Sequence, residues 1–135
     1  MGTRGIVNVT SSGNPDKILV SIYSQYDSYP SGLGEDIKKA LHDGNTKIIN
    51  GIGGAEHQCP SYFNGMECLA AYLVKSLKCG IGGIYLYSPG QTEEYNYTLY
   101  NKGADLYLKV ISSYSQSKIL FDDLLAKFDS KLIGR

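Results

Sequence analysis

The sequence predicts a single α+β domain over residues 1–135, in which an antiparallel sheet of about five strands packs with three helices. Strand-like and helix-like segments come in groups, in the order β-β-α-α-β-β-β-α, whereas a parallel α/β sheet needs strict alternation. Glycine, proline and asparagine lie between the successive strand-like runs, as turns require. A chain of 135 residues with 42% apolar composition is long enough for one hydrophobic core.

The first two strands are predicted at residues 6–11 and 17–26, and the turn residues at 13–16 join them as a hairpin. Side chains alternate between the two faces of a strand. One face of the second strand is therefore apolar, and the other is polar and aromatic. The apolar face carries Ile18, Val20 and Ile22, and the opposite face carries Ser21, Tyr23, Gln25 and Asp27.

Two helices follow, separated by a loop at residues 51–60 that shows no periodicity. The first begins near Ser31 and ends before Gly44. The second is capped by Asn64 and stops at Gly80. Its apolar stripe consists of Met66, Leu69, Ala70, Leu73 and Leu77.

Three further strands at residues 83–88, 95–101 and 105–113 are predicted to form a meander, because proline, glycine and lysine turn residues separate them. A closing helix is predicted from Ser117 onward, since apolar residues recur there at helical spacing. These residues are Leu120, Phe121, Leu124, Leu125, Phe128 and Leu132.

Tyrosine dominates the aromatic residues, with twelve tyrosines and no tryptophan in the chain. A phenol combines apolar area with a hydrogen-bonding tip, so a sheet face lined with tyrosines suits recognition. The alternative is that these tyrosines simply favour half-buried strands. The tyrosines that can share one face are Tyr23, Tyr85, Tyr87, Tyr95, Tyr97, Tyr100 and Tyr107.

The passage from the second strand into the first helix, residues 23–34, holds three tyrosines, a carboxylate, an amide and a turn. Tyr23, Gln25, Asp27 and Tyr29 are the candidate ligand-binding residues. The helix N-terminus that follows presents N–H groups to an anion, either a ligand or Asp27 itself. The alternative is that Asp27 braces the turn through a local hydrogen bond.

No complete catalytic, cofactor or metal motif accompanies this passage, so neither a cofactor nor a metal is expected. His57, Cys59, Cys68 and Cys79 are metal-ligand types, but their spacing matches no paired-ligand zinc pattern. The odd number of cysteines predicts reduced thiols and a cytoplasmic protein. A small hydrolase that uses Asp27 with His57 or Cys59 is the enzymatic alternative.

Charge and hydropathy disfavour two classes of partner. The 13 basic and 13 acidic residues give a formal net charge of zero, which lacks the positive field that nucleic acid requires. No apolar run approaches the roughly 18 residues of a membrane span, so we expect neither nucleic acid nor membrane as a partner.

Four strings in the chain resemble a family of small uncharacterised proteins of bacteriophages, large DNA viruses and some microbes. They are MGTRG at residues 1–5, YDSYPSGLG at 26–34, FNGM at 63–66 and LAA at 69–71. The resemblance covers about the first two-thirds of the chain. It implies a viral or mobile-element setting, with the host cytoplasm as the place of action, and it implies no activity.

The first strand also resembles, faintly, the start of N-terminal-nucleophile hydrolases, which place a nucleophile directly before that strand, often as Cys-Thr-Arg. Gly2 would occupy the nucleophile position here. That chemistry therefore lacks a nucleophile unless processing exposed Thr3.

These observations together predict a non-enzymatic recognition protein that binds a host protein or a small polar ligand through Tyr23, Gln25, Asp27 and Tyr29. The hydrolase is the second hypothesis. The third is a structural or virion-associated subunit that self-associates through its tyrosine-rich face. We also expect a homo-oligomer, because tyrosine-rich strands that a small domain leaves uncovered are commonly buried by symmetry partners.

Overall fold

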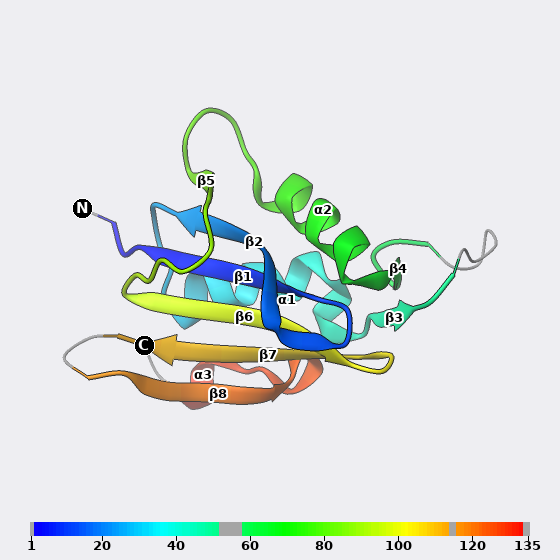
Figure 1. Cartoon of the computed structure of the whole chain (residues 1–135). Helices are drawn as coiled ribbons and strands as arrows, with labels where there is room; N and C mark the ends of the chain where they lie inside the picture. The colour runs from blue at the N-terminus through cyan, green and yellow to red at the C-terminus, as the bar shows by residue number, and fades with distance from the viewer. Residues whose placement is uncertain (1, 52–57, 114–115, 134–135) are drawn as a thin grey trace.

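The computed structural model describes residues 2–51, 58–113 and 116–133, and it confirms the α+β class. In these residues a curled sheet of eight strands is covered on one face by two main helices (Figure 1). The strands are β1 (Gly5–Ser11), β2 (Asn14–Ser24), β3 (Lys47–Ile49), β4 (Tyr62–Asn64), β5 (Ile84–Tyr87), β6 (Tyr95–Lys102), β7 (Asp105–Ser112) and β8 (Lys118–Leu124). The main helices are α1 (Glu35–Ala40) and α2 (Gly65–Leu77), and the shorter helical segments are η1 (Pro30–Gly34), η2 (His42–Gly44), η3 (Leu125–Lys127) and α3 (Ser130–Ile133).

The sheet is mixed, so the predicted five-stranded antiparallel sheet is wrong. Its strands follow the order β4-β3-β7-β6-β1-β2-β5, with β8 paired to β7. β1 is parallel to β6, and β3 is parallel to β4. The predicted meander fails because β5 joins β2 at the sheet edge instead of pairing with β6. The chain must then cross β2 and β1 to reach β6, and Figure 1 shows this connection in front of β1 with α1 behind the sheet.

The segment predicted as a closing helix is mostly a strand. β8 pairs antiparallel with β7 along its length, and the helical structure after it in the described residues is limited to η3 and α3. The spacing between Leu120, Leu124 and Phe128 fits a helix, but β7 presents a row of N–H and C=O groups that a further strand can satisfy. Long-range pairing therefore overrides the local apolar spacing.

α2 has the predicted position and Asn64 is its N-cap residue as predicted, but the Asn64 side chain makes no capping hydrogen bond. Asn64 Oδ1 accepts a hydrogen bond from the Gly51 N–H at 3.0 Å. Ser12 Oγ accepts from the Met66 N–H at 2.8 Å instead, which ties the start of α2 to the β1–β2 hairpin. The predicted stripe is buried at Met66, Leu69, Ala70 and Leu73.

The predicted loop at residues 51–60 is flanked by β3 and β4, two short strands that the sequence did not indicate. They pair with each other in parallel, and β3 also contacts β7 through the pair Lys47 and Asp105. Residues 52–57 of this loop, including His57, lie outside the described residues.

One hydrophobic core lies between the sheet and the helices. It includes Val7, Val9, Ile37, Leu69, Leu73, Tyr95, Tyr97, Leu99, Leu108 and Val110. The tyrosines therefore divide between the two faces of the sheet, because Tyr95 and Tyr97 belong to this core. The other face carries Tyr23, which stacks on Tyr87 at 4.7 Å, and Tyr100, which stacks on Tyr107 at 5.3 Å. The predicted single face of seven tyrosines is wrong.

Candidate functional site

The two sequence strings MGTRG and YDSYPSGLG are in direct contact in the structure. The Ser28 N–H donates to the Thr3 carbonyl at 3.1 Å. Gly5 lies against the same serine so closely that a Cβ at position 5 would be 2.7 Å from Ser28 Cβ. A Cβ at Gly2 would be 2.6 Å from the Gln25 carbonyl oxygen. The two strings thus form one closely packed unit. The atoms around Gly2 leave no room for a nucleophilic side chain at that position.

The turn after β2 is held by backbone contacts around Asp27. This residue has a φ of 51°, in the left-handed region that aspartate and asparagine tolerate better than most residues. Its carbonyl accepts a hydrogen bond from the Leu33 N–H at 3.0 Å. A Cβ on Gly32 would be only 2.2 Å from that carbonyl oxygen. The backbone is therefore tightly constrained, while the Asp27 side chain is exposed.

A buried tyrosine fixes this turn to the core. Tyr97 on β6 is fully buried, and its hydroxyl donates to the Ser28 carbonyl at 2.6 Å. Burial raises the pKa of the Tyr97 phenol well above its ordinary value. The phenol therefore stays protonated and can keep donating to the turn.

The four predicted ligand-binding residues do not line one cavity. Tyr23 is buried on the sheet face opposite the helices, and its hydroxyl donates to Gln25 Oε1 at 2.8 Å. Burial, and then the negative charge of Glu93, raise the pKa of Tyr23. Tyr29 extends toward Asp27, with its hydroxyl 3.4 Å from Asp27 Oδ1. The structure therefore brings the residues together as two pairs, Tyr23 with Gln25 and Asp27 with Tyr29.

Gln25 and Asp27 open onto different cavities. Gln25 lines a cavity of about 340 Å³ with Arg4 and Glu94, close to the β5–β6 connection. Asp27 lines a smaller cavity of about 120 Å³ between the end of β2, the start of α1 and the end of α2. Tyr26 borders both cavities.

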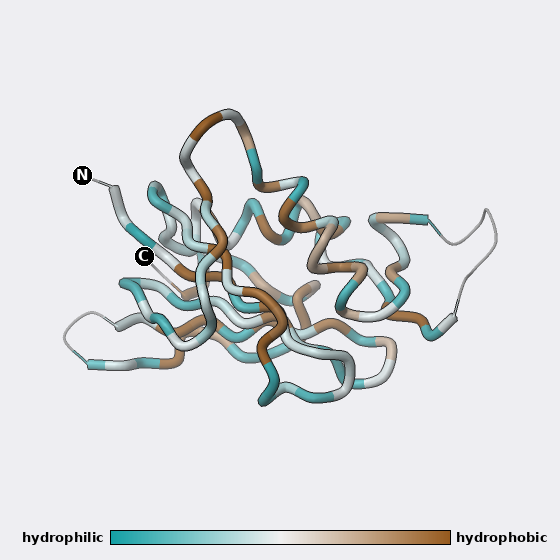
Figure 2. Tube along the Cα trace, turned by 45° about the horizontal axis from the view of Figure 1, so that its top comes forward, coloured by the Kyte–Doolittle hydropathy of each residue, from teal (hydrophilic) through white to brown (hydrophobic). Residues whose placement is uncertain are grey.

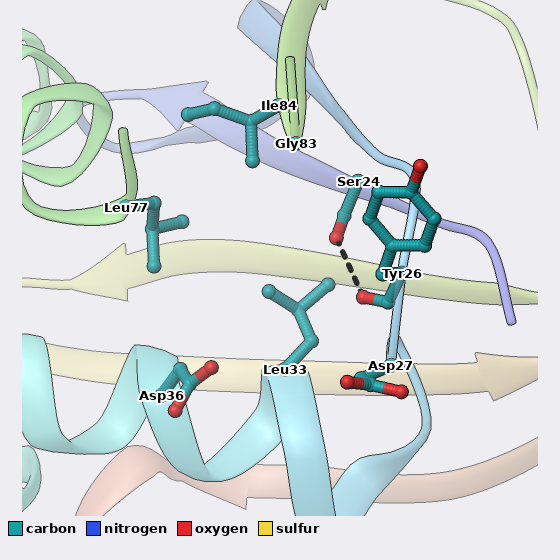
Figure 3. A pocket seen from close by; sticks show the side chains of 8 residues that line it. All are labelled: Ser24, Tyr26, Asp27, Leu33, Asp36, Leu77, Gly83 and Ile84. Carbon is teal, nitrogen blue, oxygen red and sulfur yellow. Dashed lines mark hydrogen bonds between the residues drawn. The ribbon is translucent and has the colours of Figure 1, made fainter. Parts of the chain in front are cut away.

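Two carboxylates stand on one side of the smaller cavity, to which we refer as the Asp27–Asp36 pocket (Figure 3). Figure 3 shows the Leu33 side chain pointing into the pocket between Asp27 and Asp36, with Leu77 and Ile84 across from it. Ser24, Tyr26 and Gly83 complete the lining. Sequence reasoning missed Asp36, because an acidic residue in the first turn of a helix has an ordinary explanation in the helix dipole.

Charged neighbours act on Asp36 in both directions. Burial raises the pKa of Asp36, the positive charge of Lys39 opposes this, and the negative charges of Asp27 and Glu35 each raise the pKa by a smaller amount. Lys39 does not line the Asp27–Asp36 pocket. It lines a neighbouring cavity of about 370 Å³ that shares Asp36 and Leu77 with it. Both carboxylates thus line the pocket without a basic side chain among the lining residues.

Of the residues in the hydrolase hypothesis, the structure describes Asp27 and Cys59, and it places them far apart. Cys59 immediately precedes the short segment leading to β4, which Figure 1 places at the opposite end of the sheet from the end of β2. Burial and the neighbouring Cys68 raise the pKa of Cys59, whereas a cysteine nucleophile needs a lowered pKa. All three cysteines are free thiols. In the described part of the chain, no group of three or more His, Cys, Asp or Glu residues is placed to hold a metal ion.

No protein-family model matches this sequence, and no curated protein and no solved structure resembles it at a significant level. Among the helices that the structure describes, none combines the length and apolar character needed to cross a lipid bilayer. The geometry of the pocket is therefore the basis for a functional proposal.

Proposed function

We propose that this protein is a non-enzymatic recognition module that binds a small organic cation in the Asp27–Asp36 pocket. The ligand would be a protonated primary amine, either free or at the end of a basic side chain of a partner protein. The proposal depends on one observation, that Asp27 and Asp36 line the same cavity, whose other walls include Leu33, Leu77 and Ile84. We further propose a host or virion component as the source of the amine, in line with the viral setting that the sequence strings imply.

An alkylammonium ion complements each part of this pocket. Its charge would relieve the repulsion between Asp27 and Asp36, which contributes to the raised pKa of Asp36. The Tyr26 ring borders the pocket and offers a cation–π contact. The volume of about 120 Å³ equals roughly four waters at about 30 Å³ each, enough for an ammonium group and a short alkyl chain.

Titration with n-butylamine, followed by ¹⁵N–¹H NMR, tests the proposal. We expect chemical-shift changes at residues 26–36 with the amine, and none with butanol or butyrate. The variants Asp27→Asn and Asp36→Asn should each weaken binding by about 10-fold or more, because a charge-assisted hydrogen bond contributes roughly 1.5–3 kcal/mol. Asparagine is chosen at position 27 because it tolerates the left-handed backbone, which alanine does not.

Asp43→Asn is the matched control. Asp43 is exposed and has a φ of 53°, nearly the backbone conformation of Asp27, but it does not line the pocket. This variant should bind the amine as the wild type does. Binding should also weaken as the pH falls, beginning at a higher pH than an ordinary aspartate would give, since the pKa of Asp36 is raised. Equal shifts with butanol, or unchanged affinity in both pocket variants, would contradict the proposal.

The edge strand β5 supports a second candidate function, self-association. β5 ends the strand order of the sheet, and Tyr85 and Leu86 on it are 48% and 60% exposed. Ile81, in the segment that leads into it, is fully exposed. Figure 2 shows the loop that leads into β5 projecting from the rest of the chain, with a hydrophobic portion at its tip. An edge strand without charged residues can pair antiparallel with its own copy.

We therefore predict a homodimer, measurable by light scattering, with β5 at its interface. Leu86→Lys should convert it to a monomer, because it places a like charge on both copies of an uncharged strand. Ile119→Lys is the control, since Ile119 is 56% exposed on β8, away from β5. A wild-type mass near 14.8 kDa at high concentration would count decisively against self-association.

A further inference from the structure

A third cavity, of about 410 Å³, lies on the sheet face opposite the helices and is unrelated to the proposed amine pocket. Its floor comes from β6, β7 and β8, and its facing wall comes from the start of β2. Figure 1 shows this first part of β2 bending in front of β6. The volume is in the range of small-molecule sites, about 300–1,000 Å³.

Strand-register shifts of the β-bulge kind lie in both the wall and the floor of this cavity. The β1–β2 register shifts at Thr10, so that Thr10 pairs with Ile18 and Ser11 pairs with Asn14. Pro15 and Asp16, which lie between these two pairs in the sequence of β2, line the cavity. The β7–β8 register shifts between Val110 and Ile111. Bulges bend strands and re-aim side chains, and they are frequent beside binding sites. These register shifts thus lie in the strands that enclose the cavity, and we refer to this part of the sheet as its concave face.

Polar groups of both kinds gather on the floor. Thr98, Lys109 and Asp122 are direct cross-strand partners on three adjacent strands, so their side chains form a row on one face. The Tyr100 hydroxyl donates a hydrogen bond to Asp122 Oδ1. Asp16 adds a carboxylate from the opposite wall. The cavity thus offers an ammonium, hydroxyls and two carboxylates within one volume.

We propose that this concave face binds a neutral polyhydroxylated ligand, namely a sugar unit. Sugar hydroxyls both donate and accept, which matches the carboxylates of Asp16 and Asp122 and the ammonium of Lys109. An anion bound at Lys109 would lie near the two carboxylates, and a cation would lie near the ammonium, so a charged ligand is poorly matched. The apolar residues Pro15, Ile18 and Ile111 suit the C–H faces of a pyranose.

The test is a ¹⁵N–¹H NMR titration of the full chain with glucose, galactose, mannose and N-acetylglucosamine. At least one sugar should shift resonances in residues 14–18, 98–100 and 109–111, whereas acetate and butylamine at equal concentration should not shift them. Asp122→Asn and Thr98→Val should each weaken that binding by about fivefold or more, since the first replaces a charged acceptor with a neutral amide and the second removes a hydroxyl. If Asp122→Asn disturbs the fold, the sugar affinity of Thr98→Val still tests the proposal.

Two controls separate this site from the amine pocket. Asp105→Asn changes a half-exposed carboxylate on β7 that pairs with Lys47 and does not line the cavity, and this variant should bind sugar normally. Asp36→Asn should weaken amine binding while leaving sugar binding unchanged. The proposal is overturned if none of the four sugars shifts these resonances, or if the shifts persist unchanged in both Asp122→Asn and Thr98→Val.

Discussion

Replacing Gly32 with alanine should destabilise the protein by at least about 3 kcal/mol, the largest loss that we expect from any single methyl group. The added Cβ would lie 2.2 Å from the Asp27 carbonyl oxygen and 3.2 Å from the Asp27 carbonyl carbon. Both are backbone atoms, so no side-chain rotation relieves the overlap. That same carbonyl accepts the Leu33 N–H, and moving it would also break this hydrogen bond. Urea denaturation monitored by circular dichroism measures the change in the free energy of unfolding.

Ser31→Ala is the matched control for Gly32→Ala. Ser31 is exposed in the same helical segment, η1, so its substitution should change stability by no more than about 0.5 kcal/mol. If Gly32→Ala were as stable as Ser31→Ala, the constrained turn would not exist as described. The amine affinity of Gly32→Ala should also fall, because the turn positions Asp27.

Close packing explains why glycine recurs in the segments MGTRG and YDSYPSGLG. Cβ atoms at Gly2, Gly5, Gly32 and Gly34 would each come within 3 Å of a neighbouring heavy atom. At Gly34 that neighbour is the Phe128 ring, at 2.7 Å. Much of the two strings therefore encodes the packing of the N-terminal strand on the turn. The chemistry that is free for a ligand lies mainly in the Asp27 side chain.

Local patterns in the sequence correctly predicted the elements that local interactions determine. The β1–β2 hairpin, the β6–β7 hairpin, α1 and α2 all lie close to where turn residues and apolar spacing indicate. The periodic stripe of α2 could be recognised because Leu69 and Leu73 face the core directly. These predictions depend on contacts between residues close in sequence.

The sequence failed where long-range pairing decides the structure. β8 forms because β7 is available as a partner, and nothing within residues 118–124 reveals that partner. The parallel pairing of β1 with β6 likewise follows from the position of β5 at the far edge. The candidate site shows the same limit. Asp36 lines the same pocket as Asp27 because α1 packs beside the end of β2, which no local pattern reveals. Alternation grouped Tyr23 and Gln25 with Asp27, whereas in the structure Tyr23 bonds to Gln25 and Gln25 lines a different cavity.

The Tyr97→Phe variant should lose about 1–3 kcal/mol of stability at neutral pH. The substitution keeps the ring in the core but leaves the carbonyl of the buried Ser28 without the donor that now lies 2.6 Å away. Tyr26→Phe is the matched control, because the Tyr26 side chain is largely exposed and the change should be close to neutral. An equal, small effect in both variants would show that the Tyr97 hydroxyl does not hold the turn.

The raised pKa of Tyr97 predicts how the free energy of unfolding changes at alkaline pH. The folded-state pKa of Tyr97 is raised, so the unfolded chain releases this proton first, at its ordinary pKa of about 10. As the pH rises above that value, ionisation of the unfolded state lowers the stability of the wild type. Tyr97→Phe lacks this ionisation, so its stability should fall less between pH 9 and about 11. The difference in the free energy of unfolding between the wild type and Tyr97→Phe, measured by urea denaturation, should therefore shrink as the pH rises. A constant difference would contradict a buried, protonated Tyr97.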